Sequence, residues 1–124
     1  YTAEDFSDAA GCGFQQHLAP DLWHKSLIPL GQKIRAEIGD VPTYITYDID
    51  SLDPAFAPGT GTPELGGLTT MQAMELIREL RGLSVVGCDM VEVSPPYDTT
   101  GNTALVASNL LFELLCVLPG VQYR

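Results

Sequence analysis

The sequence predicts an α/β domain built around a parallel β-sheet. Segments typical of strands and of helices alternate along the chain, and this alternation favours crossover connections between parallel strands. The segment 83–92 is a nearly continuous apolar run, as expected of a strand buried on both faces of a parallel sheet. The length of 124 residues, of which 45% are hydrophobic and 18% charged, fits one domain with its own core.

The first third of the chain is expected to hold one long helix. Residues 1–13 are polar and contain glycine, which predicts a loop, and residues 14–19 fit a short strand. An apolar stripe at helical spacing then predicts a helix over 21–38, with a kink at Pro29 and with Gly39 just beyond its end. The stripe consists of Trp23, Leu27, Leu30, Ile34 and Ile38.

Two further helices and one more strand complete the expected order. The segment 42–48 is rich in β-branched and aromatic residues, which predicts a strand. Thr69 and Gln72 have the spacing of a capping box and predict the start of a helix over 69–80. The segment 103–118 predicts a last helix that is apolar on nearly every side, so it is either fully buried or packed on another subunit. The buried stripe expected for 69–80 is Ala73, Leu76, Ile77 and Leu80.

Charge and cysteine content limit the possible partners and the compartment. The chain has 16 acidic and 6 basic residues and a formal net charge of -10, which argues against nucleic-acid and anionic-membrane binding. The apolar stretch 104–118 is short for a membrane span, and no signal peptide is recognisable. Three cysteines without metal-ligand spacing point to a reducing compartment. The absence of an initiating Met at Tyr1 indicates a piece of a longer protein.

Two long connections mark the expected functional edge of the sheet. The segments 51–68 and 94–102 have no periodic pattern, and long structureless connections in a domain are usually functional. Each follows the carboxyl end of a predicted strand, where open α/β sheets place their ligands. The sequence therefore predicts a site between these two connections.

Three acidic residues at these strand ends predict a metal or cation site. Asp48 and Asp50 stand two residues apart and would repel each other unless a divalent cation such as Mg²⁺ or Mn²⁺ lay between them. Alternatively, Asp48 could simply end the strand while Asp50 and Asp53 cap turns, as Asp often does. Glu92 follows the neighbouring strand and either reaches the same crevice or is a solvated strand end. Asp53, directly before Pro54, is expected to be a turn residue.

Other chemistries fit the sequence less well. An apolar strand ending in Asp-x-Asp also occurs in haloacid-dehalogenase-type phosphatases, but Leu52 stands where that motif has Thr or Val, and Lys25 and Lys33 both precede it. The glycine-rich run 59–62 is followed by no helix that would make it a phosphate loop. Asp89, inside an apolar strand, is interpreted as an acid supporting the site or as a satisfied buried group.

Several motifs together resemble the ureohydrolases of the arginase/agmatinase family. The longest run is Tyr44-Ile-Thr-Tyr-Asp-Ile-Asp-Ser-Leu-Asp-Pro54, and Ala57-Pro-Gly-Thr-Gly-Thr-Pro-Glu64 follows it. The segment 87–98 reads Gly-Cys-Asp-Met-Val-Glu-Val-Ser-Pro-Pro-Tyr-Asp. The last two runs are most similar to the agmatinase and guanidinobutyrase branch. The resemblance covers nearly the whole chain and matches only the carboxyl-terminal part of the family domain, so residues 1–124 are interpreted as a partial domain.

The resemblance implies a three-layer αβα fold and a binuclear Mn²⁺ centre. It implies that Asp48 and Asp50 are manganese ligands, and that Glu92 is the catalytic, substrate-binding acid that pairs with a guanidinium group. The implied reaction is hydrolysis of a small cationic guanidino substrate to urea and an amine, with agmatine (giving putrescine) expected first and 4-guanidinobutyrate next. The family also implies a homo-oligomer, a trimer or hexamer, located in the cytoplasm or in mitochondria.

One departure from the family pattern limits this prediction. The family's other manganese ligands lie upstream, in an Asp-x-His-x-x-Asp motif and a separate histidine, and neither His17 nor His24 lies in such a motif. We therefore expect residues 1–124 to have no catalytic activity without the rest of the family domain. The alternative is a truncated, non-catalytic homologue that acts as an oligomerisation partner through its last helix. The expected docking face consists of Leu110, Leu111, Leu114 and Leu115.

Overall fold

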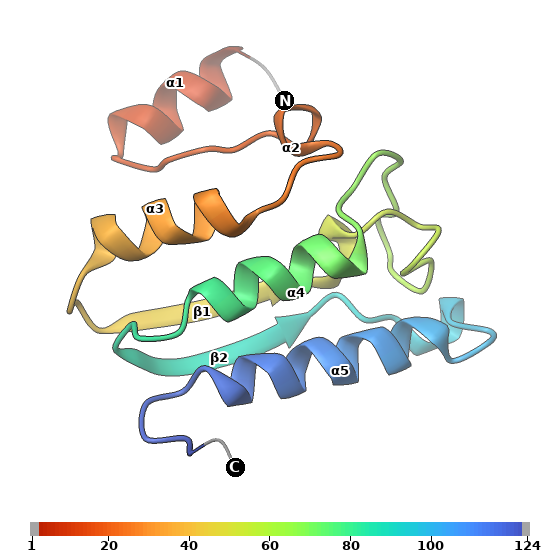
Figure 1. Ribbon diagram of the computed structural model, residues 1–124. Coiled ribbons are helices and arrows are strands. Elements are labelled where there is room, and N and C mark those ends of the chain that lie inside the picture. The colour runs from red at the N-terminus through yellow and green to blue at the C-terminus, as the bar shows by residue number, and fades with distance from the viewer. Residues whose placement is uncertain (1–2, 123–124) are drawn as a thin grey trace.

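The computed structural model describes residues 3–122, so residues 1–2, the start of the expected first loop, lie outside the described part. Helices and strands alternate as the sequence predicts, and one short 3₁₀ turn follows each strand: η1 directly after β1, and η2 beginning at Pro95, after β2 has ended at Val91. Figure 1 shows the elements in chain order. They are α1 (Ala3–Gly11), α2 (Ala19–Leu22), α3 (Ile28–Ile38), β1 (Thr43–Asp48), η1 (Ile49–Ser51), α4 (Thr70–Glu79), β2 (Val85–Val91), η2 (Pro95–Tyr97) and α5 (Asn102–Cys116).

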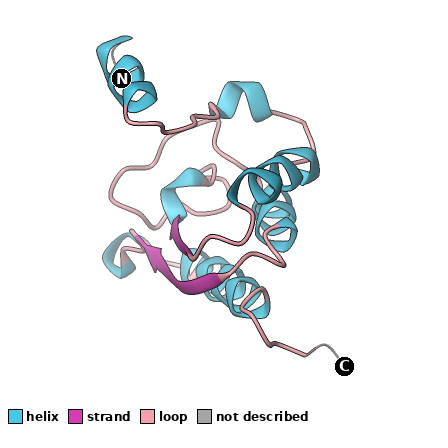
Figure 2. Cartoon of the chain, turned by 90° about the vertical axis from the view of Figure 1, so that its left-hand side faces the viewer, coloured by secondary structure: helices cyan, strands magenta, loops and turns pink. Residues whose placement is uncertain are grey.

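The sheet of the described residues consists of β1 and β2, which pair in parallel with α4 as their crossover. Ile45 and Tyr47 face the core beside Cys88 of the neighbouring strand, and Ala73 of α4 and Leu110 of α5 close the core from the other side. The helices thus cover one face of the sheet (Figure 2). This arrangement agrees with the predicted α/β class and with part of a three-layer fold.

Helix α4 begins as predicted. The Thr69 hydroxyl accepts a hydrogen bond from the Gln72 amide, and the Gln72 side chain accepts one from the Thr69 amide, so the capping box is confirmed. Ala73 and Ile77 are fully buried, as the apolar stripe requires. Gln72 also donates from Nε2 to the carbonyls of Leu22 and Lys25, which ties the segment before α3 to α4.

The predictions for residues 3–11 and 14–19 were wrong. Residues 3–11 of the expected loop form helix α1, whose first turn carries acidic side chains that favour a helix N-terminus. The segment 14–19 forms no strand: Ala19 already begins α2, and among the described residues the sheet consists of β1 and β2. The alanines and acidic residues of 3–11 favour a helix more strongly than the glycines at positions 11 and 13 disfavour it.

The single helix expected over 21–38 is two helices, α2 and α3. Pro29 lies in the first turn of α3 and starts that helix rather than kinking it, because its fixed φ and missing N–H suit a helix start. Trp23 is 58% exposed whereas Leu27 is 1% exposed, so they do not share one stripe. Gly39 ends α3 with a φ of 60°, as expected.

Helix α5 is neither fully buried nor exposed on the face that was predicted. Leu110 and Leu114 lie in the core, whereas Leu105 and Phe112 are 70% and 62% exposed. Half of the docking face predicted from the sequence is thus wrong, because Leu110 and Leu114 face the sheet and the core. Among the described residues, no helix combines the length and apolar character needed to cross a membrane.

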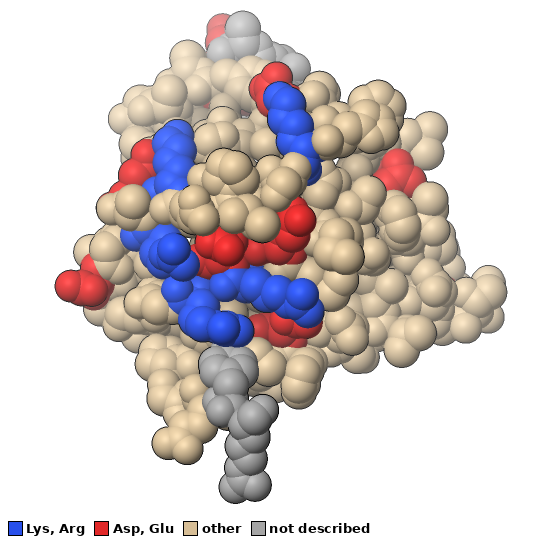
Figure 3. All heavy atoms as spheres, viewed as in Figure 1, with Lys and Arg blue, Asp and Glu red and all other residues tan. Residues whose placement is uncertain are grey.

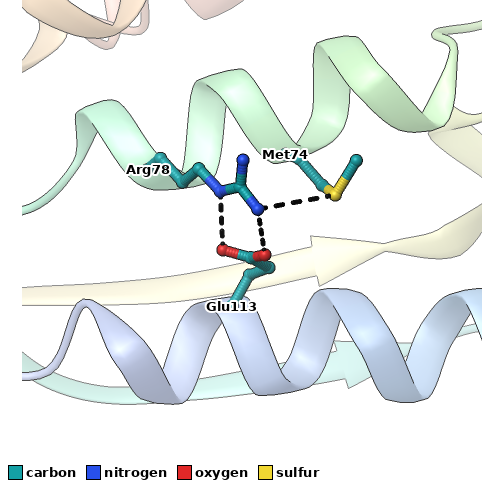
Figure 4. A network of polar contacts seen from close by, with 3 residues as sticks. All are labelled: Met74, Arg78 and Glu113. Atoms are coloured by element: carbon teal, nitrogen blue, oxygen red, sulfur yellow. Dashed lines mark hydrogen bonds and ion pairs between the residues drawn. The ribbon is translucent and has the colours of Figure 1, made fainter. Parts of the chain in front are cut away.

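A bidentate ion pair connects α5 to α4. Arg78 of α4 donates from Nε to Glu113 at 2.8 Å, and its terminal nitrogen contacts the second carboxylate oxygen and the Met74 sulfur (Figure 4). Glu113 is the one charged side chain of α5. Figure 3 shows the Lys and Arg side chains interleaved with acidic ones over the helical face.

Candidate functional site

The two long connections meet, as the sequence predicts, and hydrogen bonds hold them together. The Gly59 amide donates to the buried Thr103 hydroxyl at 2.8 Å, and the Ser94 amide donates to the Gly59 carbonyl at 2.8 Å. Asn102 adds a third link from its side-chain amide to the Phe56 carbonyl at 2.6 Å. The connection after β1 is therefore fixed to the start of α5, which places both connections at one end of the sheet.

Asp98 caps the start of α5, next to the hydrogen bond between Gly59 and Thr103. Its carboxylate accepts hydrogen bonds from the amides of Ala104 at 2.8 Å and Thr103 at 3.1 Å. These amides hold the pKa of Asp98 below its usual range, with Ala104 making the largest contribution. Gly59 packs against Asp98 so closely that an added Cβ would lie 2.5 Å from the Asp98 Cβ. The contact needs glycine for its lack of a side chain.

Asp48 and Asp50 lie side by side where β1 ends. The Asp50 amide donates to Asp48 Oδ1 at 3.0 Å, and the Thr62 hydroxyl donates to Asp50 Oδ2 at 2.6 Å. Asp48 is the last residue of β1 and Asp50 lies in the 3₁₀ turn that follows it. Within residues 3–122, one oxygen of each carboxylate thus accepts a hydrogen bond from a neutral donor, and the two carboxylates also interact with each other.

Asp48 lies near the other two predicted acids, because its carboxylate accepts a hydrogen bond from the Asp50 amide and because its partner in the sheet, Val91, directly precedes Glu92. Burial raises the pKa of Asp48, and the neighbouring carboxylates of Asp50 and Glu92 raise it further. The Asp50 amide acts in the opposite direction without cancelling these effects. A cation bound here would relieve the repulsion, and carboxylate oxygens are suitable ligands for Mg²⁺ or Mn²⁺.

Glu92 has a strained backbone. It directly follows β2, whose last residue, Val91, pairs with Asp48. Its φ is +64°, a left-handed conformation that non-glycine residues rarely adopt and that tends to occur at functional sites. Its side chain is exposed. Glu92 therefore presents a solvent-facing carboxylate beside Asp48, held there at a conformational cost.

These acids do not by themselves form a metal centre. Within residues 3–122, no group of three or more His, Cys, Asp or Glu side chains has an arrangement able to hold a metal ion. His17 and His24 lie in the segments before α2 and α3 and are not part of the site. Oxygen ligands from Asp48 and Asp50 fit a hard divalent cation, but further ligands would have to come from outside these residues.

Two other acids have local structural roles. Asp53 accepts hydrogen bonds from the amides of Ala55 and Gly66, both at 2.8 Å, and these lower its pKa, so the predicted turn role is confirmed. Asp89 accepts a hydrogen bond from the Tyr44 hydroxyl at 2.9 Å through Oδ2. Its Oδ1 is buried and has no hydrogen-bond partner in the described part of the chain.

A cavity of about 890 Å³ opens beside Asp50, large enough for a small substrate. Ser51, Thr62 and Glu64 contribute polar side chains to its lining, and Gly66 and Gly67 contribute backbone. Sequence reasoning missed Thr62, because its contact with Asp50 spans 12 residues and depends on how the connection folds back. The glycine-threonine run that contains it was the available signal.

Comparisons with known proteins agree with the observed fold. A model of the arginase family matches residues 1–116. The chain is 61% identical to a guanidinobutyrase of Pseudomonas aeruginosa over all of this chain and 39% of the relative, and 62% identical to a mitochondrial agmatinase of Gallus gallus over 89% of this chain and 32% of the relative. The structure of a proclavaminate amidino hydrolase from Streptomyces clavuligerus superposes with a TM-score of 0.84 at 39% identity, covering 93% of this chain and 38% of that one. This chain thus spans 32–39% of the length of these proteins.

Proposed function

This chain belongs to the arginase family, and we propose on that premise that it is part of a manganese-dependent enzyme that hydrolyses a linear guanidino compound to urea and an amine. The observation that carries the proposal is that Asp48 and Asp50 are joined by a hydrogen bond at the end of β1, while Glu92 directly follows Val91, the residue paired with Asp48. The activity would belong to the whole protein, since the chain spans about a third of the length of its relatives.

Asp48 and Asp50 would bind the metal. Each has one carboxylate oxygen held by a hydrogen bond and a second oxygen to offer a cation. Two Mn²⁺ ions, when bound, supply a strong nucleophile at neutral pH, which the resonance-stabilised guanidinium carbon requires. Because the remaining ligands lie outside residues 3–122, we expect the isolated chain neither to bind two Mn²⁺ tightly nor to release urea.

Glu92 would bind and orient the guanidinium group. A carboxylate can accept two parallel N–H bonds from a planar guanidinium, which fixes both its position and its plane. The exposed Glu92 carboxylate next to Asp48 would hold the guanidinium carbon at the metal-binding end of the sheet. Agmatine and 4-guanidinobutyrate share this end and differ at the other, where one has an amine and the other a carboxylate.

A chimera tests the proposal. In it, this chain replaces the matching segment of the Pseudomonas aeruginosa guanidinobutyrase, to which it is 61% identical. We expect Mn²⁺-dependent urea release from agmatine or from 4-guanidinobutyrate, and the ratio of the two kcat/KM values, compared with that of the parent enzyme, shows how this segment changes the preference between them. Glu92→Gln should lower kcat/KM by at least about 100-fold, because the charged pair with the guanidinium is lost. A folded, Mn²⁺-loaded chimera that is inactive on both compounds would contradict the proposal.

The second candidate function is that of a non-catalytic oligomerisation partner. The observation that favours it is the exposed apolar side of α5, where Leu105 and Phe112 face solvent. A chain acting in this way would co-purify with an intact family enzyme, and Phe112→Glu would abolish the association. Whether the assembly is a trimer or a hexamer, and whether the protein works in the cytoplasm or in mitochondria, stay predictions.

A further inference from the structure

We propose that Thr62 is a positioning residue for Asp50. Its hydroxyl holds one carboxylate oxygen so that the other is presented to the metal. The inference rests on the proposed function, since it assigns a role within the same site. It concerns a residue that contacts no metal in this scheme and acts only through Asp50.

The contact between the two side chains is short and specific. Thr62 Oγ1 donates to Asp50 Oδ2 at 2.6 Å, a length typical of a charge-assisted hydrogen bond from a hydroxyl to a carboxylate. Besides Thr62, the carboxylate of Asp48 also interacts with the Asp50 side chain. Thr62 is thus the neutral donor that holds Oδ2, whereas Asp48 brings a second negative charge to the same carboxylate.

The connection that carries Thr62 is fixed on both sides of it. Three residues earlier, the Gly59 amide is bonded to the buried Thr103 hydroxyl, and four residues later the Gly66 amide is bonded to Asp53 Oδ2 at 2.8 Å. Pro63 directly follows Thr62 and restricts its backbone to extended conformations. The hydroxyl is thus held in place before any ligand arrives, as positioning requires.

The physical benefit is a pre-oriented ligand in a crowded acidic site. Asp50 lies beside Asp48 and near Glu92, and repulsion would turn a free carboxylate away from these neighbours. A hydroxyl donor on Oδ2 opposes that rotation without adding charge. Groups that hold metal ligands by hydrogen bonds typically contribute 10- to 100-fold to metal affinity.

The experiment compares four variants of the 124-residue chain by NMR. Thr62→Val removes the hydroxyl at nearly constant volume, Thr62→Ser keeps it, Thr99→Val makes the same change at another exposed threonine, and Asp50→Asn removes the ligand charge. Side-chain couplings report the χ1 rotamer of Asp50 in the metal-free chain. Added MnCl₂ then broadens the amide signals of 48–50, and the concentration for half-maximal broadening measures site affinity.

We expect one dominant Asp50 rotamer in the wild-type, Thr62→Ser and Thr99→Val chains, and averaged rotamers in Thr62→Val. Half-maximal broadening in Thr62→Val should need about 10- to 100-fold more Mn²⁺, with the Ser variant near wild type. An unchanged rotamer or an unchanged Mn²⁺ requirement in Thr62→Val, with Asp50→Asn clearly weaker, would overturn the positioning role and leave the proposed metal site intact. Equal responses of wild type and Asp50→Asn would refute the proposed metal site itself, and the inference with it.

Discussion

The strained backbone of Glu92 leads to a prediction in which stability and activity change in opposite directions. A left-handed φ costs a non-glycine residue about 1–2 kcal/mol, and Glu92 has a φ of +64°. Glycine avoids that cost but loses about 0.5–1 kcal/mol through the greater freedom of the unfolded chain. We therefore expect Glu92→Gly to raise the free energy of unfolding by about 0.5–1 kcal/mol.

The expected change in the free energy of unfolding is large enough to be measured as a shift in Tm. An unfolding entropy of about 2.1 cal/mol/K per residue over 124 residues gives about 4 °C in Tm per kcal/mol, so the expected rise is about 2–4 °C. Glu92→Ala is the matched control, because it removes the same carboxylate and keeps the Cβ that causes the strain. Calorimetry of both variants, beside urea assays of both in the chimera, separates strain from charge. A glycine variant less stable than the alanine variant would refute the reasoning, as would a glycine chimera that keeps full activity.

Three further predictions concern the contacts that build the site. Thr103→Val leaves the buried Gly59 amide without its acceptor and should cost about 1–3 kcal/mol in urea denaturation, whereas Thr103→Ser should cost less than half of that. Gly59→Ala should also cost about 1–3 kcal/mol from overpacking, against little change for Gly61→Ala, which has open space around it; equal effects would contradict the packing argument. The Arg78 side chain holds the pKa of Glu113 below its ordinary value of 4.5, so the pair stabilises the fold above that pH and its contribution is lost as the pH falls through the lowered pKa. Melting curves between pH 2 and 7 should show this acid-dependent loss in wild type and a smaller one in Arg78→Met.

The parts of the fold that the sequence predicted correctly have signals contained within a few residues. The capping box at Thr69 defines the start of α4 from a four-residue pattern, and the apolar run 83–92 marks β2 without reference to the rest of the chain. The first third failed for the opposite reason. Trp23 continues a helical period by coincidence, and only the tertiary contacts of Gln72 show that the chain turns before α3.

The same distinction between local and long-range signals holds for the residues of the candidate site. Asp48, Asp50 and Glu92 are recognisable in the sequence because each lies at the end of a strand or within two residues of it, and parallel strands end at one edge of the sheet. Thr62 was missed because its role depends on hydrogen bonds at Gly59 and Gly66 that fold the connection back over the strand end. The strain at Glu92 has no counterpart in the sequence, since no residue type predicts a left-handed glutamate.

The Mn²⁺ content of the chimera tests the central claim most directly, namely that Asp48 and Asp50 are metal ligands. Metal analysis after dialysis should give two Mn²⁺ per chimeric chain, and no more than one in Asp48→Asn or Asp50→Asn, while Asp53→Asn should keep both because Asp53 only closes a turn. Two tightly held Mn²⁺ in the Asp48 and Asp50 variants would contradict the account.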